Sequence, residues 1–108
     1  MFRLDDKIAL VTGGGRGLGR AIALAFAEAG ADVVVASRTL EQLNKVAEQI
    51  RAQSRRALAV EVDVTNSASV AQMVEATRKE FGRIDVLVTC AGIGWAEKLA
   101  DISDGTWD

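Results

Sequence analysis

Glycines are concentrated in one stretch near the N-terminus, and their spacing could bind phosphate. The stretch follows the apolar run 8–11 and leads into a helical pattern. Glycine lets the backbone turn sharply, take positive φ and approach a ligand closely, and a helix N-terminus attracts a pyrophosphate through its free N–H groups. We therefore expect a phosphate cradle, to which the following residues contribute: Thr12, Gly13, Gly15, Arg16, Gly17, Leu18 and Gly19.

The spacing does not match two common phosphate-binding loops. The pattern G-x-G-x-x-G starting at Gly13 fails, because Leu18 occupies the place of the third glycine. A Walker loop starting at Gly14 reaches Gly19, but Arg20-Ala21 then replaces the lysine that binds phosphate and the hydroxyl that binds magnesium. The pattern that fits is T-G-x-x-x-G-x-G.

Strand and helix signals alternate along the chain and would position this cradle. Apolar, β-branched runs predict strands over 7–12, 32–37, 57–64 and 84–89. Three helices should separate these strands. The first runs from 17 to the stop at Gly30, the second from the Thr39–Gln42 capping box to about 54, and the third over 67–81. A further helix should start at Ser103. Strand starts about 25 residues apart indicate βαβ units. We expect an α/β fold, a Rossmann-like doubly wound parallel sheet of strand order 3-2-1-4, truncated after the fourth strand.

Apolar spacing also predicts which helix faces pack on the sheet. In the first helix the small residues Ala21, Ala25 and Ala29 should face the strands. In the second and third helices the predicted stripes are Leu40, Leu43, Ala47 and Ile50, and then Val70, Met73, Val74, Thr77 and Phe81.

The strand order reverses between the first and fourth strands, where ligands of such sheets bind. The residues expected there are the glycine stretch and Cys90-Ala91-Gly92, which follow the fourth strand. Cys90 alone could be a redox thiol, but a buried cysteine that packs as a small hydrophobe is the better interpretation.

The end of the second strand indicates the type of dinucleotide. NAD-selecting Rossmann domains usually carry an acid there, whereas this chain has Ser37 followed by Arg38. A guanidinium matches the geometry of a 2′-phosphate, and Arg16 could reach the same group. We therefore predict that NADP(H) is preferred over NAD(H).

These motifs, in this order, resemble the short-chain dehydrogenase/reductase family over nearly the whole chain. The segments 17–23 and 103–108 are similar to the classical branch that includes 3-oxoacyl-[acyl-carrier-protein] reductases. The resemblance implies that Asp63 and Val64 hold the adenine ring, although an aspartate there could also be only a helix cap. The family's fourth strand usually ends Asn-Asn-Ala-Gly, and here Thr89 and Cys90 replace both asparagines.

The resemblance implies an NAD(P)-dependent oxidoreductase that interconverts a small-molecule carbonyl and alcohol by hydride transfer in a homo-oligomeric parent. The family's catalytic serine, tyrosine and lysine follow the fourth strand, and this chain has no tyrosine. We expect residues 1–108 to be the N-terminal NADP(H)-binding half, with no catalytic residue of its own and no activity in isolation. The alternatives are a non-catalytic nucleotide-binding module and, less consistent with Arg16, Ser37 and Arg38, a methyltransferase-like domain.

Composition restricts the other classes of function. The 108 residues are 49% hydrophobic and 26% charged with a net charge of −2, as in a globular domain without a nucleic-acid surface. No apolar stretch approaches the roughly 20 residues that span a bilayer, and no signal region is present, so we expect cytoplasmic residence without a membrane partner. One cysteine and no histidine exclude a disulfide framework, a zinc cluster and a Ser-His-Asp triad within this chain.

Overall fold

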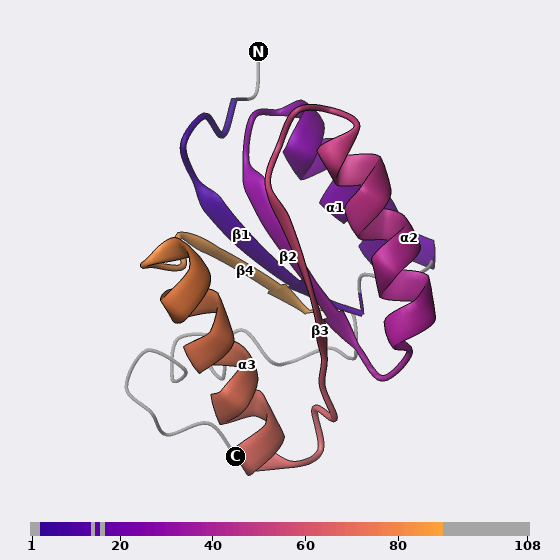
Figure 1. Cartoon of the computed structure of the whole chain (residues 1–108), viewed down its shortest axis with the longest axis vertical. Helices are drawn as coiled ribbons and strands as arrows, with labels where there is room; N and C mark the ends of the chain where they lie inside the picture. The colour runs from indigo at the N-terminus through magenta and orange to yellow at the C-terminus, as the bar shows by residue number, and fades with distance from the viewer. Residues whose placement is uncertain (1–2, 14, 16, 90–108) are drawn as a thin grey trace.

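Strands and helices alternate in the computed structural model, which describes residues 3–13, 15 and 17–89 (Figure 1). In chain order they are β1 (Ile8–Thr12), α1 (Gly17–Glu28), β2 (Asp32–Ser37), α2 (Leu40–Arg51), β3 (Ala57–Glu61), α3 (Ser67–Phe81) and β4 (Val86–Thr89). The helix predicted at Ser103 lies outside the described residues. The alternation confirms the predicted α/β class.

The four strands form one parallel sheet with the order β3-β2-β1-β4, as predicted. Ala9 of β1 pairs with Val33 of β2 on one side and with Val86 of β4 on the other. β1 and β2 are interior strands, and their side chains from Ala9 to Val11 and from Val33 to Ala36 are fully buried. Continuous apolar runs suit strands that are covered on both faces.

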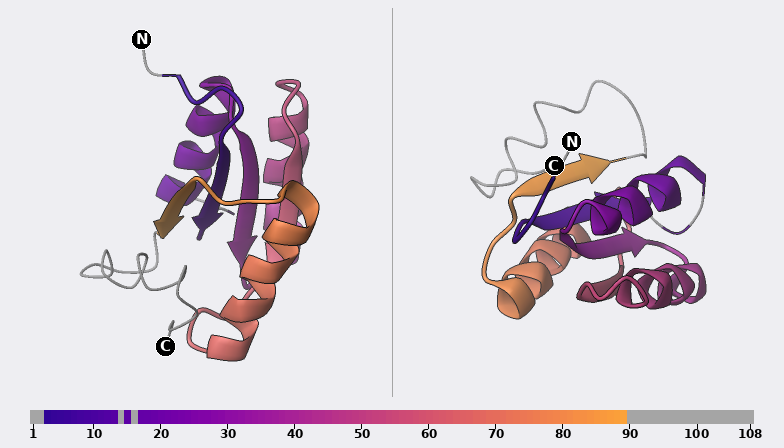
Figure 2. Two further views of the ribbon diagram at one scale, coloured as in Figure 1. Left: turned by 90° about the vertical axis from the view of Figure 1, so that its left-hand side faces the viewer. Right: turned by 90° about the horizontal axis from the view of Figure 1, so that it is seen from above.

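Helices cover both faces of the sheet and run alongside the strands (Figure 2). Alternate strand residues divide the core accordingly, because successive side chains of a strand point to opposite faces. On one face α1 and α2 pack against residues that include Ala9, Val11, Val33 and Val35. On the other face α3 packs against Leu10, Val34 and Ala36. The sheet is therefore doubly wound, as predicted.

The predicted inward face of α1 is wrong at two of its three residues. Ala21 and Ala25 are exposed, and Ala29 is buried but lies beyond the end of the helix, whereas the buried stripe within the helix consists of Gly19, Ala23 and Ala27. Alanine occupies every odd position from 21 to 31, so composition cannot distinguish one alanine stripe from the next. The structure selects the stripe of Gly19, Ala23 and Ala27.

Thr39 is the N-cap of α2, as predicted, but the side-chain bonds expected at this helix start are not made. Thr39 makes no side-chain capping bond, and its backbone N–H donates instead to the Ser37 hydroxyl over 3.2 Å. Leu40, expected inside, is 41% exposed, and Val46 joins Leu43, Ala47 and Ile50 in the buried stripe. The capping box is therefore absent.

Four element ends are shorter than predicted. β1 begins at Ile8 rather than 7, and β4 at Val86 rather than 84; α2 ends at Arg51 rather than near 54, and β3 at Glu61 rather than 64. β3 ends where its partner ends, because Glu61 pairs with Ser37, the last residue of β2. The length of a partner strand thus limits β3, although the apolar run continues.

α3 has the predicted bounds and stripe, with Val70, Met73, Val74 and Thr77 buried and Phe81 half-buried. Gly82 ends it in the left-handed conformation with φ 85°, and its N–H donates to the Arg78 carbonyl over 2.7 Å. Such a C-terminal glycine avoids the clash that a Cβ makes with the backbone at positive φ.

Gly82→Ala should lower the free energy of unfolding by about 1 kcal/mol, because alanine pays the left-handed penalty. Among the described residues, no neighbouring atom lies within 4 Å of a Cβ built there, so the loss would report backbone strain. Urea denaturation measures it. Gly82→Asn is the control and should lose less, since asparagine tolerates this conformation better. Equal stability of Gly82→Ala and the parent would contradict the strain argument.

Candidate cofactor-binding site

The glycine turn leaves the carboxyl end of β1. Thr12 is buried, and its hydroxyl donates to the Val88 carbonyl of β4 over 3.4 Å. Gly13 follows with φ 75°, and its N–H donates to the Ala36 carbonyl of β2 over 2.7 Å. The turn is thus attached to both neighbouring strands, and the positive φ at Gly13 explains why glycine is needed there.

Gly15 packs against the start of α2. A Cβ placed on Gly15 would lie 3.1 Å from the Gln42 Cβ, 3.2 Å from Gln42 Oε1 and 3.5 Å from the Ser37 hydroxyl. The first of these contacts is with an atom close to the α2 backbone, which has little freedom to move. Glycine at this position therefore lets the loop lie against Gln42 and Ser37.

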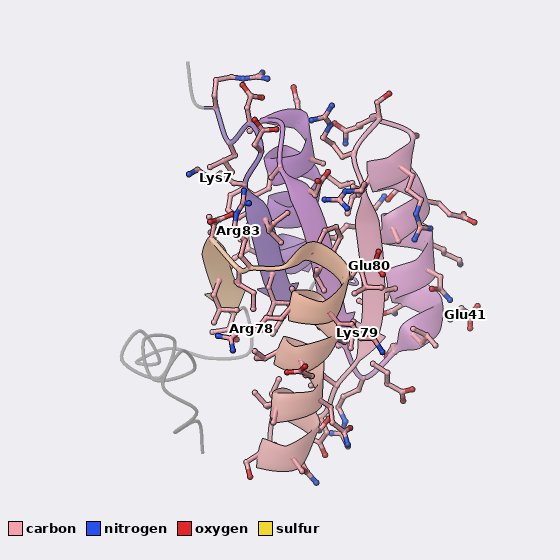
Figure 3. All side chains as sticks on the ribbon, turned by 60° about the vertical axis from the view of Figure 1, so that its left-hand side comes forward. Lys7, Glu41, Arg78, Lys79, Glu80 and Arg83 are labelled. Atoms are coloured by element: carbon pink, nitrogen blue, oxygen red, sulfur yellow. The ribbon has the colours of Figure 1, made fainter. Side chains whose placement is uncertain are left out.

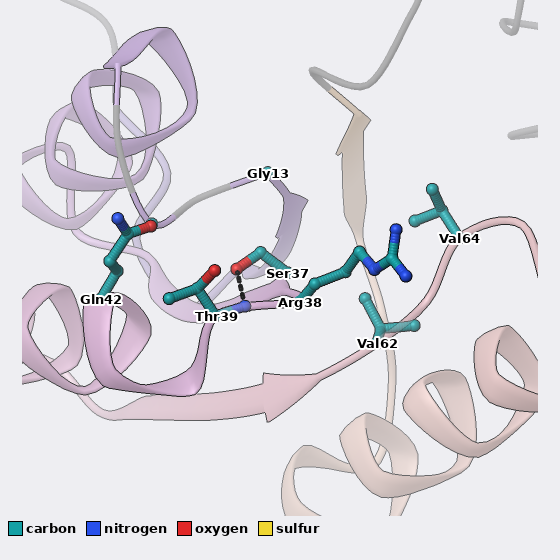
Figure 4. A pocket seen from close by; sticks show the side chains of 8 residues that line it. Gly13, Ser37, Arg38, Thr39, Gln42, Val62 and Val64 are labelled. Atoms are coloured by element: carbon teal, nitrogen blue, oxygen red, sulfur yellow. Dashed lines mark hydrogen bonds between the residues drawn. The ribbon is translucent and has the colours of Figure 1, made fainter.

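A cavity of about 360 Å³ opens between the glycine turn and the ends of β2 and β3 (Figure 4). Ser37 and Arg38 lie along it, and the Arg38 side chain extends toward Val62 and Val64 (Figure 4). Its lining consists of Gly13, Gly15, Ser37, Arg38, Thr39, Gln42, Val62 and Val64. Five of these residues were predicted from the sequence, and Thr39, Gln42 and Val62 were not predicted as site residues.

Arg38 lines this cavity and also lies close to Asp63, which does not line it. Arg38 Nη2 lies 4.0 Å from Asp63 Oδ2, and the Arg38 side chain is 75% exposed. At such exposure an ion pair contributes little to stability. Arg38 and Asp63 together line an adjoining hollow of about 490 Å³ with Glu61, Val62 and Ser69. Arg38 can therefore turn toward a bound anion at little cost.

The Asp63 carboxylate is held in its ionised form. Hydrogen bonds from the Thr65 hydroxyl and then from the Thr65 backbone N–H lower the pKa of Asp63, and the charge of Arg38 acts in the same direction. Asp63 does not cap α3, because Asn66 is the N-cap and accepts from the Ser69 N–H over 3.0 Å. The interpretation of Asp63 as a helix cap is therefore wrong.

The start of α1 presents residues with three different environments. Gly17 has φ 59° and lies in an outer hollow with Arg20 and Lys45. Leu18 is 71% exposed, although it is large and apolar, and Gly19 is buried in the helix stripe. An exposed leucine beside a glycine turn can cover an apolar part of a ligand.

Four predicted site residues, Arg16, Cys90, Ala91 and Gly92, lie outside the described residues. The strand that leads to the last three is described as far as Thr89, which is buried and pairs with Thr12 of β1. The reversal of strand order between β1 and β4 is therefore present, beside the glycine turn where the sequence placed the site.

The described residues form neither a metal-ligand cluster nor a membrane-spanning helix. Within residues 3–13, 15 and 17–89, no group of three or more metal-ligating side chains could hold a metal ion. Over the same described part of the chain, no helix is long and apolar enough to cross a membrane.

The parallel sheet, the strand order and the glycine turn define a Rossmann-like α/β protein. Comparison with protein families then gives the particular family. The model for short chain dehydrogenases matches residues 7–108, and the chain belongs to this family. The narrower likeness to 3-oxoacyl-[acyl-carrier-protein] reductases stays a prediction.

Individual relatives agree with this assignment. The chain is 56% identical over 92 residues to an uncharacterized oxidoreductase of Mycobacterium tuberculosis. This match covers 85% of the chain and 35% of the relative. It is 42% identical over 108 residues to versicolorin reductase 1 of Dothistroma septosporum, and this match covers 99% of the chain and 41% of that protein. A short-chain type dehydrogenase/reductase of Mycobacterium marinum superposes with TM-score 0.77 and 42% identity, over 80% of this chain and 35% of that one.

The chain spans between 35% and 46% of the length of the curated relatives it matches. The solved structure of the hydroxysteroid dehydrogenase of Escherichia coli superposes with TM-score 0.78 and 35% identity. This superposition covers 80% of this chain and 35% of that one. The correspondence is therefore with part of each relative.

Proposed function

We propose that this chain supplies the NADP(H)-binding part of a short-chain oxidoreductase. The observation that carries the proposal is Arg38, an exposed guanidinium at the edge of the cavity, placed directly after the uncharged Ser37 at the end of β2. A carboxylate at Ser37 would repel a 2′-phosphate, and its absence together with Arg38 favours the phosphorylated dinucleotide.

The glycine turn fits the pyrophosphate of such a cofactor. Gly15 lies so close to Gln42 that a Cβ at this position would be only 3.1 Å from the Gln42 Cβ, and the turn leads into the N-terminus of α1. Free N–H groups at that terminus favour phosphate. From the sequence we assign Arg16 to the 2′-phosphate and Cys90, Ala91 and Gly92 to the ribose side of the site.

The adenine ring would lie between Arg38 and the end of β3. Val62 and Val64 line the cavity there and supply apolar surface for a purine (Figure 4). A guanidinium stacks well on aromatic faces, so Arg38 can contact both the ring and the phosphate. The Asp63 carboxylate would accept a hydrogen bond from the adenine amino group.

The whole protein would reduce a small-molecule carbonyl or oxidise the corresponding alcohol, as a homo-oligomer in the cytoplasm. The nicotinamide supplies or accepts the hydride. The family's acid is a tyrosine, and these 108 residues contain none, so we infer that the chain alone binds nucleotide without turnover. An assay of carbonyl reduction by the chain alone tests this inference. We expect no turnover, whereas measurable turnover would indicate a self-sufficient enzyme.

Binding of the adenosine half of the cofactor tests the proposal. We expect the chain to bind 2′,5′-ADP at least tenfold more tightly than 5′-AMP, because hydrogen bonds to charged groups contribute about 1.5–3 kcal/mol. Isothermal titration at low and at high salt measures both affinities, and the preference should shrink at high salt. Equal binding of the two nucleotides would contradict the assignment of Arg38.

A further inference from the structure

We propose that Thr65 is a positioning residue, which orients the Asp63 carboxylate so that one of its oxygens is presented to the adenine amino group. This inference rests on the proposed function, and within it on the place of Asp63 beside the adenine ring. Thr65 itself lies outside the lining of the cavity, on the segment between β3 and α3. In this proposal Thr65 acts in recognition of the adenine base and takes no part in recognition of the 2′-phosphate.

Both hydrogen bonds from Thr65 reach the same carboxylate oxygen. The Thr65 hydroxyl donates to Asp63 Oδ1 over 2.6 Å, and the Thr65 backbone N–H donates to Oδ1 over 3.0 Å. The other oxygen, Oδ2, is the one that faces Arg38 at 4.0 Å. Thr65 therefore occupies Oδ1 and leaves Oδ2 on the side of Arg38, with which Asp63 lines the adjoining hollow.

The backbone of this segment is already fixed by α3. The Asp63 N–H donates to the Ser69 hydroxyl over 3.0 Å, and the Asp63 carbonyl accepts from the Asn66 N–H over 3.0 Å. With the main chain held at both of its polar groups, the remaining freedom of Asp63 is rotation of its side chain. The two bonds from Thr65 restrict that rotation.

A fixed carboxylate oxygen distinguishes purines by the group at their 6-position. Adenine carries an amino group that donates to Oδ2, whereas hypoxanthine carries a carbonyl oxygen that the carboxylate repels. A site that holds its acceptor in place rejects a mismatched partner, since the polar groups are then left unpaired. Loss of the Thr65 hydroxyl should therefore weaken discrimination between the two bases.

The test compares binding of NADPH with binding of its hypoxanthine analogue to the chain. We expect the parent chain to bind NADPH about tenfold more tightly, as one hydrogen bond to a charged group allows. Thr65→Val keeps the size and the backbone N–H of threonine but loses one of the two restraints on Oδ1. In this variant the ratio of the affinity for NADPH to the affinity for the hypoxanthine analogue should fall to about threefold. Thr65→Ser restores the hydroxyl and should restore the ratio. Fluorescence titration measures all six affinities.

Several outcomes would overturn the inference. An unchanged ratio in Thr65→Val, or a reduced ratio in Thr65→Ser, would show that the hydroxyl does not orient Asp63. Weaker binding of both dinucleotides by the same factor would indicate a structural role only. Thr65→Ala gives a second deletion of the hydroxyl if the valine variant loses its far-UV circular dichroism. If the parent chain binds neither dinucleotide, the proposed function itself fails, which is a different result from an unchanged ratio.

Discussion

Replacing Leu10 by alanine is expected to lower the free energy of unfolding by about 3 kcal/mol, within the range of roughly 2–5 kcal/mol for buried leucines. Leu10 is fully buried in β1, where it packs in the cluster formed with α3, including Val34, Met73 and Val74. Its removal loses buried apolar surface and leaves a cavity that the surrounding sheet can fill only in part. Urea denaturation followed by circular dichroism measures the loss.

Leu18→Ala is the matched control for this experiment. The same atoms are removed, but Leu18 is 71% exposed on α1, so the free chain should change by less than about 0.5 kcal/mol. Because domains are stable by only about 5–15 kcal/mol, the Leu10 variant should unfold at visibly lower urea concentration. A similar loss in both variants would contradict the assignment of Leu10 to the core.

Arg38→Asp is expected to weaken NADPH binding about 10- to 100-fold, since it removes charge-assisted hydrogen bonds to the 2′-phosphate and adds a repelling carboxylate. NADH affinity should stay within about threefold, because NADH lacks the 2′-phosphate that Arg38 is proposed to bind. The ratio of the two dissociation constants, measured by titration at fixed ionic strength, is the readout. It should shift toward NADH.

Arg78→Asp makes the same change of charge elsewhere. Arg78 is exposed in the last turn of α3 (Figure 3). Asp63 precedes the first turn of this helix and so lies at its other end. We expect it to leave the ratio of NADPH to NADH affinity unchanged, although it should cost some stability at a helix C-terminus. An Arg38→Asp variant that keeps its preference for NADPH would remove the basis of the proposed cofactor.

The sheet order and the bounds of α3 could be predicted because few arrangements of strands and helices satisfy the apolar pattern of the sequence. Parallel strands joined by right-handed crossovers leave 3-2-1-4 as the usual order, and Val70, Met73 and Val74 define a single apolar face. The face of α1 could not be predicted, since alanine at every odd position supports more than one stripe. Of these stripes, the one that includes Ala23 and Ala27 is buried in the structure.

The candidate site could be predicted only where a local pattern carries the signal. Gly13, Ser37 and Arg38 follow strand ends and could be read in order along the chain. Gln42 was missed because its place in the site depends on the approach of Gly15, a contact between distant parts of the chain. Its position three residues after Thr39 matched a capping box instead, and that local pattern was misleading.

Thermal unfolding of the chain, alone and with NADPH or NADH at equal concentration, tests the central claim most directly. A ligand that binds only the folded state must raise the midpoint, by an amount that grows with its affinity. We predict one cooperative transition, raised more by NADPH than by NADH. A midpoint that neither dinucleotide raises, or that NADH raises at least as much as NADPH, would contradict the assignment of these residues to NADP(H) binding.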